Sequence, residues 1–481
     1  MNDHTLTIRD VADVSGGLTK NAKRDSYPGR RPYLTVANVY ANRLQLDDVG
    51  EIGITDAEVA RVELAAGDLL VVEGNGSLSQ LGRVALWSGA IPGCVHQNHL
   101  IKVRPRPKVT SKWLLYWLLS PKGRAAIEAV GSSTSGLHTL SISKVESLPV
   151  VVRPLDEQHR IVAAIETHFS RLDAAVASLT RAKANVKRAR ASVLKAAVEG
   201  RLVPTEAALA RAEGRDYEPA AVRVARVEQP PRPNRYKTRS TDVVPGHAAL
   251  SVGDTQAALP EGWTRAPMVE VARMESGHTP SRSHPEWWDG DVPWIGIADA
   301  REHHGGVTHD TEQHTNADGL ANSAARLLPA GTVCISRTAS VGYVVVMGRP
   351  MATSQDFVDW ICTDALDPHW VRVVFLADRD ALLRFGKGSV HKTIYFPELL
   401  SLHIAIPPLA EQHRIVAEVD RRLSVLDALD ATLDANLARC DRLRQAVLKR
   451  AFEGRLVPAE ADAPLLAAEP QMTLFAQDAR S

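Results

Sequence analysis

The sequence predicts an α+β protein made of two similar halves, in which two mixed globular domains alternate with two long helices. Three observations lead to this prediction. The segment 154–163 returns almost unchanged as 408–417, and 199–204 returns as 453–458, both at an offset of 254 residues. Apolar residues recur every seven positions between the repeated segments, which is typical of helices that pack on another helix. Short apolar runs punctuated by glycine precede each helix and indicate strands.

Length and composition are those of a protein with several cores. At 481 residues the chain is too long for a single core. Hydrophobic residues make up 44% and charged residues 23%, which is usual for globular proteins. No window is apolar for long enough to cross a membrane and no signal peptide is recognisable, so we expect a cytoplasmic protein. The scattered cysteines have no metal-ligand spacing, and we expect them to stay reduced: Cys94, Cys334, Cys362 and Cys440.

The charge is distributed unevenly along the chain. The net charge is only +1, yet residues 1–150 hold 17 basic against 14 acidic side chains and residues 154–204 hold 9 against 5. Residues 259–407 hold 12 basic against 18 acidic side chains. If both globular domains bind DNA, the second must therefore do so through a local basic patch rather than through its overall field.

The repeats divide the chain into six segments. We expect a first globular domain, a first spacer helix, a linker, a second globular domain, a second spacer helix and a tail at residues 1–153, 154–204, 205–258, 259–407, 408–458 and 459–481. Each globular domain has a glycine-led run, 67–72 and 331–336, and ends in a strand-like run directly before its helix. We therefore expect two α+β domains dominated by short strands.

The spacer helices carry matching apolar stripes. Heptad positions of the first are Ile165, Leu172, Leu179, Val186 and Val193, and those of the second are Val419, Leu426, Leu433, Cys440 and Val447. Flanking positions widen the stripes: Ile161, Phe169 and Val176 in one, Ile415, Leu423 and Leu429 in the other. Glycine and proline end both helices, at Gly200, Pro204, Gly454 and Pro458. About 45 residues give a helix of roughly 68 Å.

One such helix alone would leave its apolar stripe in water. The economical solution is that the two helices pair with each other, and a pseudo-twofold relation between the halves would make the pair an antiparallel coiled coil. The alternative is that each helix packs only on its own globular domain or on a partner chain. Between them, residues 205–258 are predicted to be a linker because 229–235 is rich in proline and arginine.

No motif for catalysis is present. The sequence lacks GxxxxGK[ST], GxGxxG after a strand, and GxSxG. The best group of metal-ligand residue types fits neither HExxH nor a structural zinc pattern, and we interpret it as a solvated loop: His303, His304, His309 and His314. Glu157 and Glu411 recur at equivalent positions, but a structural or partner-docking role is favoured inside a helix-start signature. Two equal copies fit paired recognition better than one active site.

Two sets of motifs carry a resemblance to a known family. The first is the repeated Pro-Leu-x-Glu-Gln-His-Arg-Ile-Val-Ala helix start at 154–163 and 408–417. The second is Gly-His-Thr-Pro-Ser at 277–281, followed by the double-tryptophan segment 287–295. Together they resemble the specificity subunits of type I restriction-modification enzymes, the second set resembling the opening of that family's target recognition domain. The first domain has no double-tryptophan segment, so the register of its recognition loops is left open.

The resemblance implies a non-catalytic subunit that binds double-stranded DNA. Each target recognition domain would read one half of a split sequence, and the two helices would set the gap between the halves. The helices would also dock two methyltransferase subunits, which use S-adenosylmethionine. Translocase and nuclease subunits that use ATP and Mg²⁺ would join this core, and the chain itself would bind no cofactor. A cytoplasmic location fits such a complex.

Candidate functional residues follow from this reading. Base contacts in the major groove need Arg, Lys, Asn, Gln, Ser or Thr on exposed loops. Candidates in the first domain are Arg30, Arg31, Tyr33, Asn75, Ser77, Gln80, Arg83, Gln97, Asn98 and His138. Candidates in the second are Arg282, His284, Trp288, Arg337, Ser340, Gln355, Lys387, His391, Lys392 and Tyr395, whereas Trp287 and Trp294 are expected in the core. Partner docking is expected at Glu157, Gln158, Arg160, Glu411, Gln412 and Arg414.

Three other readings stay open on the sequence. The chain could be a stand-alone DNA-binding protein with two domains, an enzyme with cryptic nuclease or methylase motifs, or a scaffold whose domains bind proteins. In addition, 471–475 in the tail (Gln-Met-Thr-Leu-Phe) resembles the short peptide that binds bacterial sliding clamps, and peptides of this kind dock from mobile tails.

Overall fold

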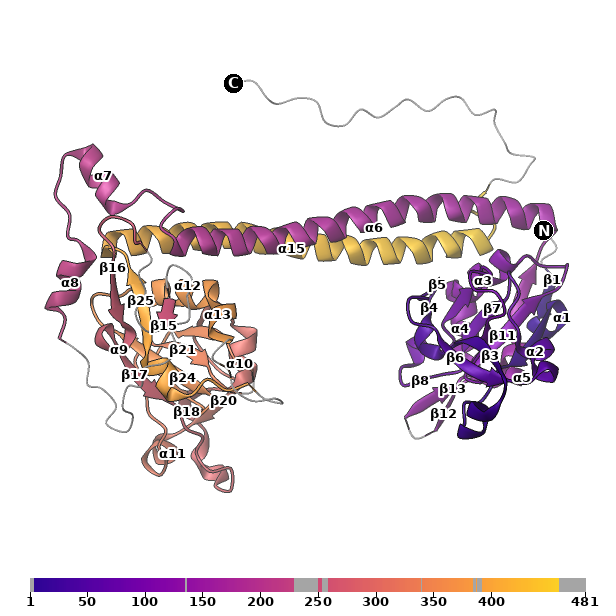
Figure 1. The fold of residues 1–481 in the computed structure, drawn as a ribbon, viewed down its shortest axis with the longest axis horizontal. Helices are drawn as coiled ribbons and strands as arrows, with labels where there is room; N and C mark the ends of the chain where they lie inside the picture. The colour runs from indigo at the N-terminus through magenta and orange to yellow at the C-terminus, as the bar shows by residue number, and fades with distance from the viewer. Residues whose placement is uncertain are drawn as a thin grey trace. The chain divides into compact units, whose positions relative to one another are not determined.

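The computed structural model describes residues 4–134, 136–228, 250–252, 258–338, 340–383, 386 and 392–457 (Figure 1). The chain forms two compact units: unit 1 is Met1–Thr180 with Asp434–Ser481, and unit 2 is Arg181–Leu433. Each unit therefore combines one globular domain with a part of both spacer helices. The clamp-like peptide 471–475 lies outside the described residues.

The globular domain of unit 1 is built from short strands and a few helices, in line with the predicted α+β class. Its strands are β1 (His4–Thr7), β2 (Ala12–Gly16), β3 (Gly29–Leu34), β4 (Val39–Tyr40), β5 (Arg43–Leu44), β6 (Gly50–Ile54), β7 (Leu69–Val72), β8 (Gly74–Asn75), β9 (Val84–Leu86), β10 (Val95–His96), β11 (Leu100–Pro105), β12 (Ser132–Thr134), β13 (Leu137–Thr139) and β14 (Pro149–Val152). Its α-helices are α1 (Ile8–Val11), α2 (Asp56–Val62), α3 (Ser111–Leu119), α4 (Pro121–Val130) and α5 (Ile142–Glu146).

The globular domain of unit 2 is assembled in the same manner. Its strands are β15 (Leu250–Val252), β16 (Thr264–Pro267), β17 (Ala272–Ser276), β18 (Trp288–Ile295), β19 (Val307–Thr308), β20 (Gln313–Thr315), β21 (Val333–Ser336), β22 (Val344–Met347), β23 (Ala352–Thr353), β24 (Phe357–Cys362) and β25 (Leu402–Ile406). Its α-helices are α9 (Met268–Val271), α10 (Ile297–Glu302), α11 (Ala317–Ala321), α12 (Pro368–Ala377), α13 (Arg379–Leu383) and α14 (Phe396–Leu400).

The two domains share one strand topology. The antiparallel sheet β2-β11-β7-β9 has the counterpart β17-β24-β21-β22, to which β19 adds an edge. In a second sheet, β3 pairs parallel with β10 and antiparallel with β6, and β18 pairs in the same senses with β23 and β20. The last strand closes each domain, because β14 pairs with β1 and β25 pairs with β16 on one side and β15 on the other. The internal repeat predicted from the helix signatures is therefore also present in the fold of the domains.

One buried tryptophan fixes the aromatic helix of each domain. Trp113 in α3 and Trp370 in α12 are fully buried. The Trp113 indole N–H donates to the Val151 carbonyl at 2.8 Å, and the Trp370 indole N–H donates to the Ala405 carbonyl at 3.2 Å. Each indole thus ties its helix to the strand that leads directly into a spacer helix.

The spacer helices are α6 (Leu155–Val198) and α15 (Leu409–Phe452), each an unbroken helix of 44 residues. They pair antiparallel, as predicted (Figure 1). In unit 1 Arg444 of α15 pairs with Asp173 of α6, and in unit 2 Arg190 of α6 pairs with Asp427 of α15. The seam buries heptad positions of both helices, among them Ile165, Val186, Val419, Leu433 and Cys440. Leu429 departs from the prediction, because it is 44% exposed and lies outside the seam.

Each spacer helix ends against the globular domain of the unit that holds its C-terminal part. Phe452 packs edge-on against the rings of Trp113 and Trp117, at 4.8 and 5.1 Å between ring centroids. Gly200, two residues past the end of α6, has φ +66°, and a side chain there would meet Pro260 and Trp263. Gly200, which was predicted as a helix end, therefore also allows this close approach.

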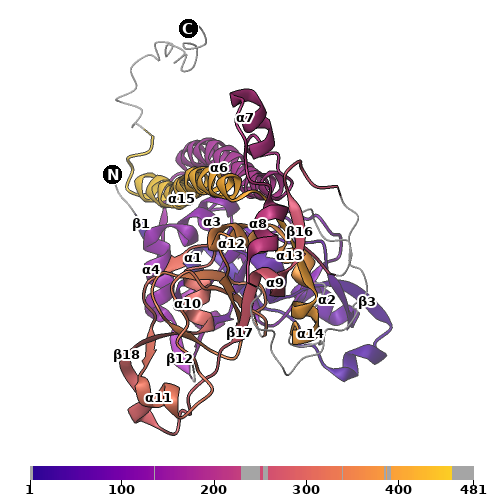
Figure 2. The same cartoon turned by 90° about the vertical axis from the view of Figure 1, so that its left-hand side faces the viewer.

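The segment predicted as a linker begins with folded structure. It contains α7 (Glu206–Glu213) and α8 (Ala220–Arg226), whose alanines Ala207, Ala210 and Ala220 are buried. Figure 2 shows α7 beside the spacer helices. The proline-rich stretch 229–235 lies outside the described residues. Small alanine side chains let these helices pack closely against their neighbours. Because large apolar residues are scarce in this segment, its sequence does not show the pattern of a packed helix.

Among the described residues, no helix has the combination of length and apolar character needed to cross a membrane.

Candidate nucleic-acid interface

A glycine places the first loop of each domain. A Cβ atom at Gly17 would collide with the backbone carbonyl of His96, and one at Gly277 would collide with the backbone of Thr353. Only glycine lets the chain after β2 or β17 run this close to the neighbouring strand. Gly17 and Gly277 therefore mark the same position in the two domains.

An aromatic side chain fixes the same loop by one hydrogen bond. The Tyr33 hydroxyl donates to the Leu18 carbonyl at 2.8 Å, and the Trp294 indole N–H donates to the His278 carbonyl at 3.0 Å. Tyr33 of β3 is thus the counterpart of Trp294 of β18, which settles the register that the sequence left open. Tyr33 is 3% exposed and Trp294 is 6% exposed. Tyr33 is consequently a core residue and not a DNA-contacting one, whereas Trp294 lies in the core as expected.

The loop of unit 2 holds Arg282 on an aromatic platform. The guanidinium carbon lies 3.7 Å from the ring centroid of Trp288 and 5.3 Å from that of Trp294. Arg282 Nη2 donates to Gln313 Oε1 at 2.5 Å. In the same loop, His284 stacks on Trp287 with ring centroids 4.1 Å apart. Arg282 and His284 are thus exposed in this loop, each against a tryptophan ring, and Trp288 is half-buried.

A second group of candidates adjoins this loop. Gln355 accepts a hydrogen bond from Thr279, and its carbonyl accepts one from Arg337 Nη2 at 3.1 Å. The Arg337 guanidinium lies 4.5 Å from the ring centroid of Phe396. Tyr395 is 50% exposed next to that ring. Of the remaining candidates in unit 2, Lys392 is exposed, Ser340 is half-buried, and Lys387 and His391 lie outside the described residues.

Unit 1 carries a different side chain at the position of Arg337. The Arg337 N–H donates to the Asp356 carbonyl at 2.7 Å, directly after the β21-β24 pair. The Glu73 N–H donates to the His99 carbonyl at 3.0 Å, directly after the corresponding β7-β11 pair. The Glu73 carboxylate lies 2.7 Å from His99 Nδ1. The two domains thus present opposite charges from one backbone position.

Four candidates of unit 1 lie near Glu73: Asn75, Ser77, Gln80 and His138. Asn75 of β8 faces His138 of β13 across the strand pair, and Asn75 Oδ1 accepts the Ser77 N–H at 2.9 Å. Gln80 follows in the same exposed loop. The remaining candidates are less free: Gln97 accepts the Val36 N–H, Asn98 contacts His99, Arg83 stacks over Tyr40, Arg30 faces Glu51, and Arg31 packs on Gly93.

The repeated glutamines of the helix starts are structural. Gln158 and Gln412 are fully buried. Gln412 Oε1 accepts the Asp367 N–H at 2.8 Å, and its Nε2 donates to the carbonyls of Ala365 and Pro407, both at 2.9 Å. Gln158 makes the same three bonds in unit 1, to Thr110, Lys108 and Arg153. The partner-docking role expected for both residues is therefore corrected: each clamps a spacer helix to its own globular domain.

Glu411 and Arg414 also hold the chain to itself. Glu411 is fully buried and accepts the Glu206 N–H at 2.7 Å and the Trp263 indole N–H at 2.8 Å. Burial raises the pKa of Glu411, and these two hydrogen bonds oppose the rise. Arg414 Nη1 lies 2.6 Å from the Glu206 carboxylate. Both residues thus fasten α7. Burial leaves Glu411 no surface for the expected docking role, whereas docking by Arg414, 32% exposed, stays a prediction.

The counterparts in unit 1 are placed differently. Glu157 pairs with Arg153 one turn away and is partly exposed, and Arg160 is exposed. Of the six predicted docking residues, these two are the ones that unit 1 keeps near the surface.

Metal ligands do not gather in the described part of the chain. No group of three potential ligands gathers there, and His304 is occupied by accepting the Val344 N–H at 3.1 Å.

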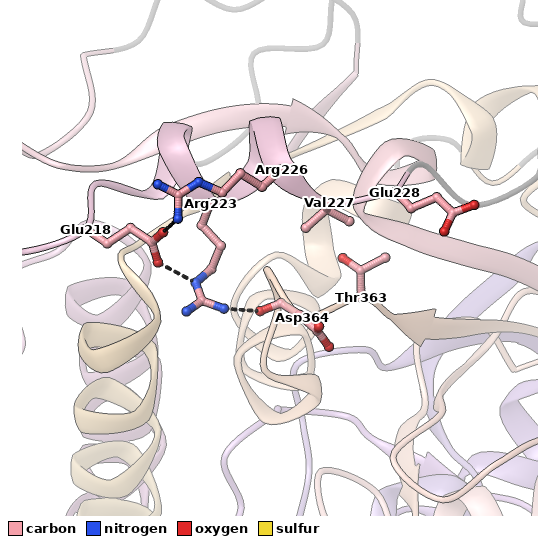
Figure 3. A pocket seen from close by; sticks show the side chains of 7 residues that line it. All are labelled: Glu218, Arg223, Arg226, Val227, Glu228, Thr363 and Asp364. Carbon is pink, nitrogen blue, oxygen red and sulfur yellow. Dashed lines mark hydrogen bonds and ion pairs between the residues drawn. The ribbon is translucent and has the colours of Figure 1, made fainter.

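A hollow of about 360 Å³ lies between α8 and the loop at Asp364 (Figure 3). Glu218, just before α8, binds Arg223 and Arg226 of that helix at 2.9 and 2.7 Å, and Arg223 Nη1 donates to the Asp364 carbonyl at 3.1 Å, which ties α8 to the domain.

The fold and loops define a duplicated α+β protein whose two domains carry different side chains at corresponding loop positions. The chain belongs to the family of the type I restriction modification DNA specificity domain, whose model matches residues 4–180 and 260–438. The matches coincide with the two globular domains and the first parts of both spacer helices.

Relatives of known name and one solved structure agree with this assignment. The type I restriction enzyme MjaIX specificity subunit of Methanocaldococcus jannaschii is 24% identical over 33% of this chain and 37% of its own length. The EcoKI specificity subunit of Escherichia coli K12 is 29% identical over 36% of this chain and 37% of its own length. The chain thus spans little more than a third of these relatives. A chain from a structure of complex assembly in the type I R-M system shares the fold, with TM-score 0.66 and 17% identity over 95% of this chain and 99% of that chain.

Proposed function

We propose that this chain is the DNA-binding specificity subunit of a type I restriction-modification complex and that each globular domain reads one half of a bipartite target. One observation carries the proposal. The two domains hold their recognition loops by the same glycine and the same hydrogen bond, yet present different side chains, such as Glu73 against Arg337. Reading two different half-sites requires loops that are held in the same way but present different side chains to the bases.

Local basic side chains would let the domain of unit 2 bind DNA although it holds more acidic than basic residues. Two of its exposed cations, Arg282 and Lys392, stand in these loops, and Arg337 is partly exposed. Local cations of this kind bind phosphates and base edges even when the domain as a whole repels DNA. Binding by this domain should therefore weaken steeply with salt.

The spacer helices would set the unread gap. Both are unbroken over 44 residues, which corresponds to about 66 Å for one helix and exceeds one turn of duplex, about 34 Å. A stiff pair of helices would keep the gap constant whatever the domains read.

Docking of two methyltransferase subunits is also part of the proposal. Exposed apolar side chains on α15 support it: Val425 at 60%, Leu429 at 44% and Leu443 at 43% exposure. Apolar residues on the outer face of a helix favour a partner surface. The partners would carry S-adenosylmethionine, and ATP and Mg²⁺ on nuclease subunits, whereas this chain would supply only recognition in the cytoplasm.

Co-purification with the cognate methyltransferase, followed by mapping of methylated bases across the genome, tests the proposal. We expect a split motif with one constant gap. Tight sequence-specific binding by the chain alone, with no methyltransferase retained, would favour the alternative of a stand-alone DNA-binding or scaffold protein.

A further inference from the structure

We propose that Arg282 reads a guanine in the half-site of the second domain, with Trp288 as its positioning residue. This inference rests on the proposed function and names the base that this site takes. It is carried by the surroundings of Arg282, which fix the plane of the guanidinium and leave its charge unneutralised.

The platform beneath Arg282 is rigid. Trp294 is 6% exposed and is held by its bond to the His278 carbonyl. Trp288 stands edge-on to Trp294, with ring centroids 5.2 Å apart and planes at 87°. The guanidinium lies 3.7 Å from the Trp288 ring centroid, well inside the range of a cation–π interaction. This contact holds the guanidinium over the face of the ring.

A single hydrogen bond then fixes the rotation of the guanidinium over that ring. Arg282 Nη2 donates to Gln313 Oε1 at 2.5 Å. Arginine has five N–H donors, so most of them stay available after this bond. Within the described part of the chain, Arg282 has no carboxylate within ion-pair distance, unlike Arg326 of the same unit, which pairs with Glu275.

Guanine is the base that matches this arrangement. It presents two acceptors, O6 and N7, side by side in the major groove, and the planar fork of arginine meets both at once. A phosphate contact would need positive charge but no fixed plane. Two tryptophans and a glutamine that orient one guanidinium therefore favour base reading over backbone binding.

The corresponding loop of unit 1 uses its arginine differently. Arg24 donates from Nε to the Thr19 carbonyl at 2.7 Å and from Nη2 to Glu58 at 2.9 Å. Its side chain is 11% exposed, and the bound guanidinium lowers the pKa of Glu58 to about 2. Because this arginine holds the loop together, the inference applies to the second half-site alone.

The test uses the complex with its methyltransferase and the target mapped for the wild type. Affinity is measured for duplexes that carry each base at each position of both half-sites. For Arg282→Ala we expect about a 10- to 100-fold loss of discrimination at one guanine of the second half-site, and unchanged discrimination in the first. Arg282→Lys should keep the charge but lose the discrimination.

Positioning by Trp288 has its own readout. Trp288→Ala should lower the affinity for duplexes that carry the guanine. It should lower the affinity for duplexes with another base at that position much less, so that discrimination is lost. Trp288→Phe, which keeps an aromatic ring, should retain the discrimination. Arg326→Ala is the matched control, because it removes an exposed arginine of the same unit whose charge is already paired.

Several outcomes would overturn the inference. Equal loss for all bases, rescued by Arg282→Lys, would make Arg282 a phosphate contact. Unchanged discrimination in Arg282→Ala would exclude any reading role. A wild-type complex that methylates no split target would instead overturn the proposed function, and the inference with it.

Discussion

The clamp at Gln412 gives the sharpest prediction about how the spacer helices are held. Replacing Gln412 by alanine removes three hydrogen bonds to the backbone at Asp367, Ala365 and Pro407. The Gln412 side chain is fully buried. Water therefore cannot readily take the place of its amide as the partner of the three backbone groups. Each buried group left without a partner costs about 1–3 kcal/mol, which gives roughly 3–5 kcal/mol once partial relaxation is allowed for.

Hydrogen exchange followed by mass spectrometry is the suitable assay, because it reports the opening of one segment. A loss of about 3 kcal/mol should speed exchange in peptides over 363–376 and 407–416 by roughly two orders of magnitude. Exchange in unit 1 should stay unchanged. Gln445→Ala, at an exposed position of the same helix, serves as the control. A change in Gln412→Ala no larger than in this control would refute the clamp.

Three further predictions follow from individual contacts. Phe452→Ala should destabilise unit 1 by about 3–5 kcal/mol, because the ring is 3% exposed and packs on Trp113; denaturation followed by tryptophan fluorescence checks this, and Phe452→Leu should cost less. Burial raises the pKa of Asp359 to about 7, so between about pH 4 and pH 7 the folded state holds a proton that the unfolded chain has lost, and stability should fall as pH rises through this window; Asp359→Asn should abolish that slope in pH-dependent melting. Arg337→Ala should weaken binding to the second half-site only, as measured with duplexes altered in either half, whereas equal loss in both would assign Arg337 to folding.

Much of the architecture was predictable from the repeated signatures. The constant offset of 254 residues, the heptad stripe and the terminal glycines predict two paired helices and their ends, because each signal comes from local geometry. The shared fold of the globular domains had a weaker signal. Val-Ala at 11–12 and 271–272, followed by Gly17 and Gly277, would have aligned the first loops and shown that Tyr33 replaces Trp294.

The roles of the repeated polar residues could not be predicted in the same way. A glutamine near a helix start serves a partner or the chain's own backbone equally well, and the outcome depends on where Asp367 or Thr110 lies in space. The platform of Arg282 likewise depends on strand β18 turning Trp288 and Trp294 toward one loop. Such tertiary contacts have no fixed spacing in the sequence.

The central claim is that two domains read separate half-sites while the spacer helices set the gap. Seven residues inserted into each helix, after Thr180 and after Leu433, preserve the heptad seam and add about 10 Å, or about three base pairs. Methylation mapping should then show the same two half-sites with a gap longer by about three base pairs, and insertion into one helix alone should abolish methylation. An unchanged gap, or altered half-sites, would contradict this claim.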